Sequence, residues 1–262
     1  FTFIPAIAGN GGIGGWNELP FQLGEVNRNG VARYALIVII FSLIRFINKK
    51  KGSRHFFLLL LLYALYLLVQ TQSRSALLGL AVVTMLVFYL KGLNWRFLLL
   101  GPSFAYAIWM AGYKIRAQGE FDQLISLTGR EGTWQKGLEQ ISASPFFGWG
   151  FQADRLLLEF EHMHNSYLHV AIQSGILGLL FFAGAVIGTW KLILRNKFFK
   201  EKIKTGGVNK FLVIESIAVV AFLTVRSFFE STAAFYGVDQ ILLIAHIGYL
   251  QLAAKASLPP EV

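Results

Sequence analysis

The sequence predicts an all-α protein, a polytopic bundle of helices that crosses a membrane several times. Of its 262 residues, 55% are hydrophobic and 15% are charged, whereas a soluble domain has about a quarter charged residues and a little under half apolar ones. The apolar residues also stand in long uninterrupted blocks. These observations exclude a soluble globular enzyme and a disordered chain, and the absence of cysteine excludes a disulfide scaffold and a thiol nucleophile.

A membrane-spanning helix needs about 20 consecutive apolar residues, and seven blocks approach this length. They run over about 31–47, 56–72, 75–90, 97–113, 166–194, 211–229 and 238–254. The last block is the weakest, because it contains Asp239, Gln240 and His246. The polar stretch 114–165 is expected to form one loop within a single membrane domain that covers residues 1–262.

Basic residues indicate which connections face the cytoplasm. If the chain crosses the membrane at every block, the segments 48–55, 91–96 and 191–210 fall on one side. Counted with the adjoining span ends and the C-terminus, that side carries 15 of the 24 Lys and Arg residues and 3 of the 14 Asp and Glu residues. The basic residues behind the net charge of +10 are therefore explained by the orientation of a membrane protein whose loop 114–165 lies outside. No nucleic-acid partner is expected.

Charged side chains at a membrane face are costly and often mark functional sites. Arg74 stands in a very short outer turn between two apolar blocks. Arg130 stands near the start of a short amphipathic helix, which a capping box of Thr128 and Glu131 begins and Pro145 ends. Each arginine either holds a phosphate group through bidentate hydrogen bonds or contacts lipid headgroups.

His164 directly precedes the fifth apolar block, where Asn165 or Ser166 is expected to cap the helix. The positive end of a helix disfavours an imidazolium, so a neutral ring at this place accepts a proton as a general base does. The alternative is a structural histidine at a helix start. His162 and His164 match no common zinc spacing, and we expect no metal site.

Four residues are supporting candidates around Arg74, Arg130 and His164: Asn165, Trp134, Arg226 and Glu230. The last two are spaced as an i, i+4 ion pair at the outer end of the sixth block. In the fifth block, Gly175 and Gly178 are expected to allow close helix packing. Arginines and a histidine on one membrane face indicate transfer chemistry on a lipid-linked phosphate or diphosphate.

Several short motifs follow one another in a recognisable order. They are Asn27-Arg28-Asn29-Gly30, Ser73-Arg74-Ser75, Thr128-Gly129-Arg130 with Trp134, Pro145-Phe-Phe-Gly148-Trp-Gly150, His164-Asn165-Ser166-Tyr167-Leu168, and Gly175 with Gly178. Together they resemble the O-antigen ligase / O-antigen polymerase superfamily. The resemblance implies a bacterial inner-membrane glycosyltransferase of the C-type fold, whose active site faces the periplasm.

The resemblance also implies substrates and roles. The donor is a glycan on undecaprenyl diphosphate, and no cofactor, metal or nucleotide is needed. Arg74 and Arg130 match the arginines that hold the donor diphosphate, and His164 matches the histidine that activates the acceptor hydroxyl. Glu230 is similar to a recurring acidic position on the outer face. Members have about a dozen spans, so this chain, which opens on Phe1 without a signal-peptide pattern, is expected to be the C-terminal part of a longer protein.

The acceptor remains open in the sequence. Attack by a lipid A core sugar gives ligation in lipopolysaccharide biosynthesis, attack by another lipid-linked repeat gives polymerisation of a surface polysaccharide, and attack by a protein hydroxyl gives O-glycosylation. A lipid-linked glycan transporter is the alternative from another class, although the spans show no internal repeat. A non-catalytic scaffold of a glycan-assembly complex is the third. The sequence specifies neither the stereochemical outcome nor the oligomeric state.

Overall fold

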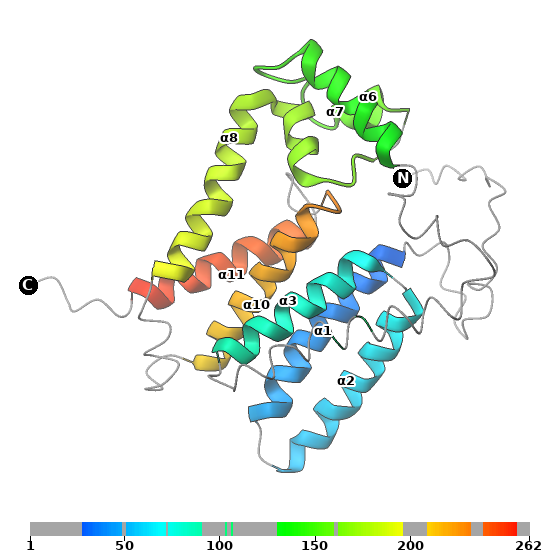
Figure 1. The fold of residues 1–262 in the computed structure, drawn as a ribbon. Coiled ribbons are helices and arrows are strands. Elements are labelled where there is room, and N and C mark those ends of the chain that lie inside the picture. Colours follow the sequence, from blue (N-terminus) through cyan, green and yellow to red (C-terminus); the bar gives the residue numbers. More distant parts are fainter. Residues whose placement is uncertain are drawn as a thin grey trace, which may run out of the picture.

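The chain folds into a bundle of long helices with a small helical layer at one end (Figure 1). The computed structural model describes residues 28–48, 51–71, 73–90, 103, 106, 130–159, 162–195, 209–231 and 238–255. The helices in these ranges are α1 (Arg28–Asn48), α2 (Lys51–Thr71), α3 (Arg74–Leu90), α6 (Arg130–Ala143), α7 (Ala153–Leu157), α8 (Ser166–Arg195), α10 (Lys210–Ser227) and α11 (Val238–Lys255). No strand occurs in the described ranges, and the all-α class is confirmed.

Six of the seven apolar blocks correspond to helices. The block 97–113, apart from residues 103 and 106, and the capping residue Thr128 lie outside the described residues. Among the residues that the structure describes, three helices contain segments long and apolar enough to cross a membrane, Asn29–Ile47, Ser53–Thr71 and Ser166–Leu194. The apolar helix α3 is shorter. This is the organisation of a helical membrane protein.

Helix α10 is the centre of the bundle. It packs against α1 and α3 on one side and against α8 and α11 on the other, and its residues from Val213 to Leu223 are buried. The close approach of α3 depends on Gly79, because a Cβ atom there would lie 2.8 Å from the ring of Phe222 and 3.1 Å from Leu36. A helix that is apolar on all sides is stable only inside such a bundle.

The charges within α10 and α11 are paired with α1. Arg45 lies 3.2 Å from the buried carboxylate of Glu215, and Arg33 lies 3.1 Å from Asp239. The hydroxyl of Ser216 lies 3.0 Å from Nδ1 of His246. These contacts explain how the seventh block forms a helix despite its polar residues, because charges in a membrane-embedded bundle need partners inside the bundle.

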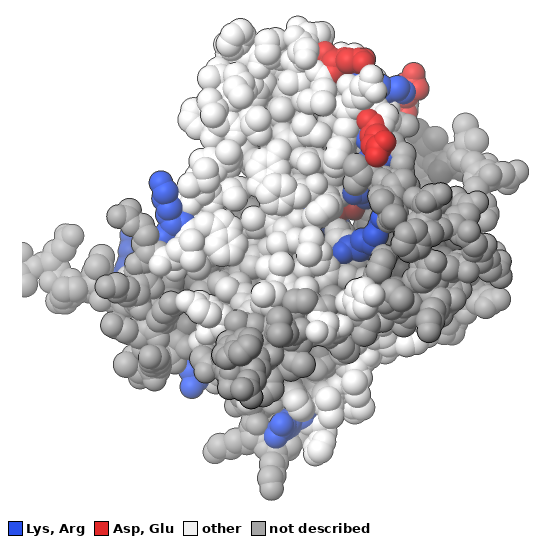
Figure 2. Space-filling model, in the orientation of Figure 1, with Lys and Arg blue, Asp and Glu red and all other residues white. Residues whose placement is uncertain are grey.

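The surface of the long half of α8 is apolar. Leu180, Phe181, Ile187 and Leu194 expose more than half of their surface. In the view of Figure 2 a broad area of the surface carries no charged side chain. Acidic side chains gather at the end that carries α6 and α7, with basic side chains beside them, and further basic side chains stand at the left and lower edges. Such a surface fits contact with lipid tails between two charged interfaces.

Helix α8 is broken at Gly175, which has φ 64° and ψ −163°. The segment 145–150 supplies hydrogen-bond partners at the break: Trp149 N donates to Ile172 O and Gly150 N to Gln173 O, both at 2.9 Å, and Ile176 N donates to Pro145 O at 2.7 Å. The expectation that Gly175 serves helix packing is therefore wrong. Its missing side chain lets the backbone of the loop approach the backbone of the break.

Replacing Gly175 with Ala is expected to lower the free energy of unfolding by about 3 kcal/mol or more. A Cβ atom there would overlap the backbone of Phe146, and the φ of Gly175 suits only glycine. Gly184→Ala on the same helix is the matched control, because a Cβ atom there meets nothing within 4 Å. A thermal unfolding curve in detergent measures both variants. Equal midpoints would contradict the assignment of the break to Gly175.

Candidate active site

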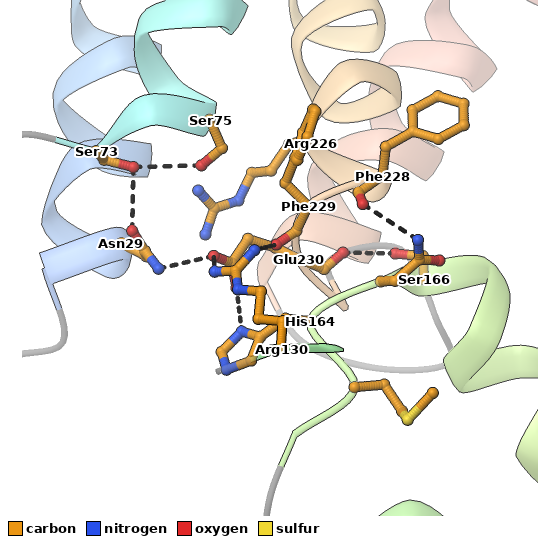
Figure 3. Close-up of polar contacts among 12 residues, drawn as sticks. Asn29, Ser73, Ser75, Arg130, His164, Ser166, Arg226, Phe228, Phe229 and Glu230 are labelled. Atoms are coloured by element: carbon orange, nitrogen blue, oxygen red, sulfur yellow. Dashed lines mark hydrogen bonds and ion pairs between the residues drawn. The ribbon is translucent and has the colours of Figure 1, made fainter. Parts of the chain in front are cut away.

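The acidic residue Glu230 lies just beyond the end of α10, in a turn that the sequence did not indicate. The turn is closed by main-chain hydrogen bonds from Phe229 N and Glu230 N to Arg226 O, each of 2.9 Å. The turn directs the Glu230 side chain back toward the starts of α1, α6 and α8, where 10% of it is exposed (Figure 3). A carboxylate this deeply buried requires partners.

Three side chains from three segments meet the Glu230 carboxylate. Oε1 accepts a hydrogen bond of 2.7 Å from Asn29 Nδ2 and one of 3.2 Å from Arg130 Nη2. Oε2 lies 2.9 Å from His164 Nδ1. One carboxylate thus holds the first turn of α1, the first residue of α6 and the segment before α8 together, as Figure 3 shows.

Electrostatics keep Glu230 ionised. Burial alone would raise the pKa of this carboxyl, but the hydrogen bond from His164 and the charges of His164, Arg226 and Arg130 outweigh burial and lower it below its usual value. The group is therefore a carboxylate at neutral pH and accepts hydrogen bonds only.

Arg130 is anchored at two points. Besides the Glu230 contact, its Nη1 donates to the carbonyl of Phe229 at 2.7 Å. The side chain remains 22% exposed. A guanidinium has five N–H donors, so two contacts fix its orientation and leave donors for a ligand that approaches from outside.

The main chain at His164 adopts an unusual conformation. Its φ is 46°, which non-glycine residues seldom adopt, and the next residue caps α8: Asn165 Oδ1 accepts from Tyr167 N at 2.9 Å and from Leu168 N at 3.1 Å. The prediction of a cap at Asn165 or Ser166 is confirmed at Asn165. Because the Glu230 carboxylate carries no proton, Nδ1 is the donor, and Nε2 of a neutral ring carries the lone pair.

The segment that bears His164 is held from both sides. Trp134 Nε1 donates to the carbonyl of Met163 at 2.6 Å, and the Met163 side chain is buried against Gly137 of α6. On the other side, Ser166 Oγ donates to the carbonyl of Glu230 at 2.9 Å. Trp134 therefore acts on His164 through the main chain.

A buried polar cluster fastens α7 to α8 nearby. His169 Nδ1 lies 2.8 Å from Asp154 Oδ2, and Gln173 Nε2 lies 2.8 Å from His169 Nε2. Burial would raise the pKa of Asp154, but the hydrogen bond and charge of His169 lower it overall. All three side chains are buried, so we interpret this cluster as structural support for the loop.

The start of α3 joins the site through hydroxyl groups. Ser73 Oγ donates to Asn29 Oδ1 at 3.0 Å and lies 3.2 Å from Ser75 Oγ. Arg74 stands between these two serines, is the first residue of α3 and has an exposed side chain. Arg130, His164 and Glu230 therefore meet directly, and the residues flanking Arg74 reach them through Asn29.

The expected ion pair between Arg226 and Glu230 within one helix is wrong. Helix α10 ends at Ser227, so Glu230 leaves the helical face and pairs with Arg130 and His164. Arg226 is 4% exposed, and its Nε lies 3.8 Å from Asp239 Oδ2. In Figure 3 its guanidinium lies between Glu230 and the serines of α3. The sequence places Asn29 in a motif and Asp239 among the polar residues of the last apolar block, but it assigns neither residue to the site.

Part of the chain is similar in sequence to known proteins. Residues 56–183 match the family model described as O-antigen ligase. Over 194 residues the chain is 26% identical to the exopolysaccharide production protein ExoQ of Rhizobium meliloti (strain 1021). That alignment covers 62% of this chain and 45% of ExoQ, so the chain spans less than half the length of this relative. The resemblance indicated by the motifs is confirmed.

Proposed function

We propose that this chain is a membrane protein of O-antigen ligase/polymerase-type polysaccharide assembly and that it transfers a glycan from undecaprenyl diphosphate to an acceptor hydroxyl. The match of residues 56–183 to the O-antigen ligase family model supports this proposal. The main support for this proposal is that the Glu230 carboxylate contacts both Arg130 and His164. A phosphate-binding cation and a proton acceptor thus belong to one rigid unit.

The diphosphate of the donor binds to Arg130 and Arg74. Arg130 is oriented by Phe229 and Glu230, and Arg74 stands on the adjoining helix start. Guanidinium groups form paired hydrogen bonds with phosphate oxygens. They also stabilise the negative charge that grows on the departing diphosphate, which is where fixed positive charge lowers a barrier most. This supports transfer without a metal or a nucleotide.

His164 takes the proton of the acceptor. As Nε2 accepts this proton, the acceptor oxygen forms a bond to the anomeric carbon, the bond from that carbon to the diphosphate oxygen breaks, and undecaprenyl diphosphate leaves as an anion. Glu230 holds Nδ1 and stabilises the imidazolium that forms, in the way a carboxylate supports a catalytic histidine. A single displacement of this kind inverts the anomeric configuration.

The reaction takes place at the periplasmic face of the bacterial inner membrane. The inference rests on the excess of Lys and Arg in the segments at the other end of the spans. The acceptor is a lipid A core sugar, a second lipid-linked glycan or a protein hydroxyl. The relative's name, an exopolysaccharide production protein, favours a second lipid-linked glycan and hence polymerisation.

The test is a transfer assay with the purified full-length protein, an undecaprenyl-diphosphate-linked glycan, a chelator and no nucleotide. We expect product growth with release of undecaprenyl diphosphate. Arg130→Ala is expected to reduce kcat/KM for the donor by about 10²-fold or more, whereas Lys136→Ala on the exposed face of α6 is expected to leave it unchanged. Donor binding without turnover across all three acceptor classes would instead indicate a transporter or a scaffold.

A further inference from the structure

A crevice lies between α8, α10 and α11. Its cavity volume is about 70 Å³, and it is partly open to the outside. Phe182 and Val186 of α8, Val220 and Leu223 of α10, and Leu243 of α11 are among its walls. It lies within the apolar part of the bundle and belongs to none of the contacts described for the candidate active site.

The crevice offers hydrocarbon contacts although three hydroxyl groups line it. Thr189 donates to the carbonyl of Ala185 at 2.8 Å, Thr224 to that of Val220 at 2.8 Å, and Ser227 to that of Thr224 at 2.7 Å. Each hydroxyl hydrogen is used within its own helix. The crevice therefore favours an apolar chain, because a polar ligand would give up its hydration for few hydrogen bonds.

One end of the crevice reaches the candidate site. Ser227 lines it, ends α10 and directly precedes the turn that carries Glu230. Val220 lies seven residues earlier, which places the far end about 10 Å deeper along the helix. The crevice thus extends from the turn at Glu230 toward the interior of the bundle.

An aromatic group joins the crevice to the residues around His164. The ring of Tyr167 lies 5.3 Å from that of Phe182, which lines the crevice, and 4.9 Å from that of Phe228. The carbonyl of Phe228 accepts a hydrogen bond of 3.1 Å from Asn165 Nδ2. Apolar surface is therefore continuous from the crevice to the neighbours of His164 and Glu230.

We propose that this crevice binds the polyprenyl chain of the donor, with its first isoprene units between α8 and α10. The inference rests on the proposed function: a diphosphate held at Arg130 carries a long hydrocarbon chain that must leave the site through apolar surroundings. The crevice begins beside the site, is lined by apolar atoms and leads into the bundle. It thereby selects a lipid carrier over a soluble diphosphate.

The test compares two bulky substitutions on one helix. Val186→Trp fills the crevice, whereas Ile187→Trp adds the same volume to a side chain that is 54% exposed. With the undecaprenyl-linked donor, we expect Val186→Trp to raise KM about tenfold and Ile187→Trp to leave it unchanged. With a donor whose lipid is a single isoprene unit, both variants are expected to match the wild type.

A second measurement uses the unaltered protein, so that misfolding of a variant does not decide the question. A polyprenyl diphosphate with a diazirine on an early isoprene unit is expected to label peptides of α8 and α10 around Val186 and Leu223. Labelling elsewhere, or equal kinetic effects of the two Trp variants, would overturn the proposal and leave the crevice to bilayer lipid or another protein segment. Absence of turnover with labelled peptides in place would refute the proposed transfer and retain the lipid site.

Discussion

Replacing His164 with Ala is expected to lower kcat for glycan transfer by roughly 10²–10⁴-fold, with little change in the KM of the donor. The imidazole accepts a proton only in the transition state, whereas the arginines bind the donor in the ground state, so the loss appears in kcat. The Glu230 carboxylate, 2.9 Å from Nδ1, holds the ring with Nε2 as the proton acceptor. Initial rates over a range of donor concentrations, at saturating acceptor, measure the effect.

His162 provides the matched control for this variant. Its ring centre lies 5.7 Å from that of His164, so both substitutions remove an imidazole from the same segment. Burial and the neighbouring charge of Arg155 lower the pKa of His162, which keeps the His162 ring neutral near pH 7. His162→Ala is expected to transfer glycan at the wild-type rate. Equal losses in both variants would show that the segment, and not a proton acceptor, was damaged.

The fold could be predicted where apolar residues form long blocks. The blocks 31–47, 56–72 and 75–90 correspond to α1, α2 and α3, because the helix is the structure that satisfies main-chain hydrogen bonds in hydrocarbon. The break in α8 could not be predicted in this way. Gly175 lies in an uninterrupted apolar block, and the groups that stabilise its conformation belong to the loop 145–150.

Individual residues of the candidate site could be predicted from the sequence, but the contacts among them could not. His164 and Arg130 stood out because histidine and arginine are costly at a membrane face. Their common partner was assigned to the wrong neighbour, since i, i+4 spacing gives a contact only while the helix continues. Helix α10 ends at Ser227, and nothing in its local sequence indicates that Glu230 meets side chains 66 and 100 residues away.

Replacing Glu230 with Gln is expected to lower kcat on the order of 10³-fold and the free energy of unfolding by about 3 kcal/mol. The amide has nearly the same shape, but its NH₂ group replaces one of the two oxygens that accept from Asn29, Arg130 and His164. The guanidinium of Arg130 loses its counter-charge in either orientation of the amide, and the NH₂ group faces either the N–H donors of Asn29 and Arg130 or the Nδ1 donor of His164. Transfer kinetics and thermal unfolding of the same preparation measure both effects.

The pH dependence of stability separates this role from a mere loss of packing. The pKa of Glu230 is lower in the folded protein than its usual value of 4.5, so the folded state favours the carboxylate. Its contribution to stability is complete above about pH 4.5 and is lost as the pH falls through the lowered pKa. The difference in the free energy of unfolding between the wild type and Glu230→Gln should therefore become smaller below pH 4.5. Glu139→Gln, at an exposed position of α6, should follow the wild type throughout, and a constant difference for Glu230→Gln would contradict an ionised Glu230 at the site.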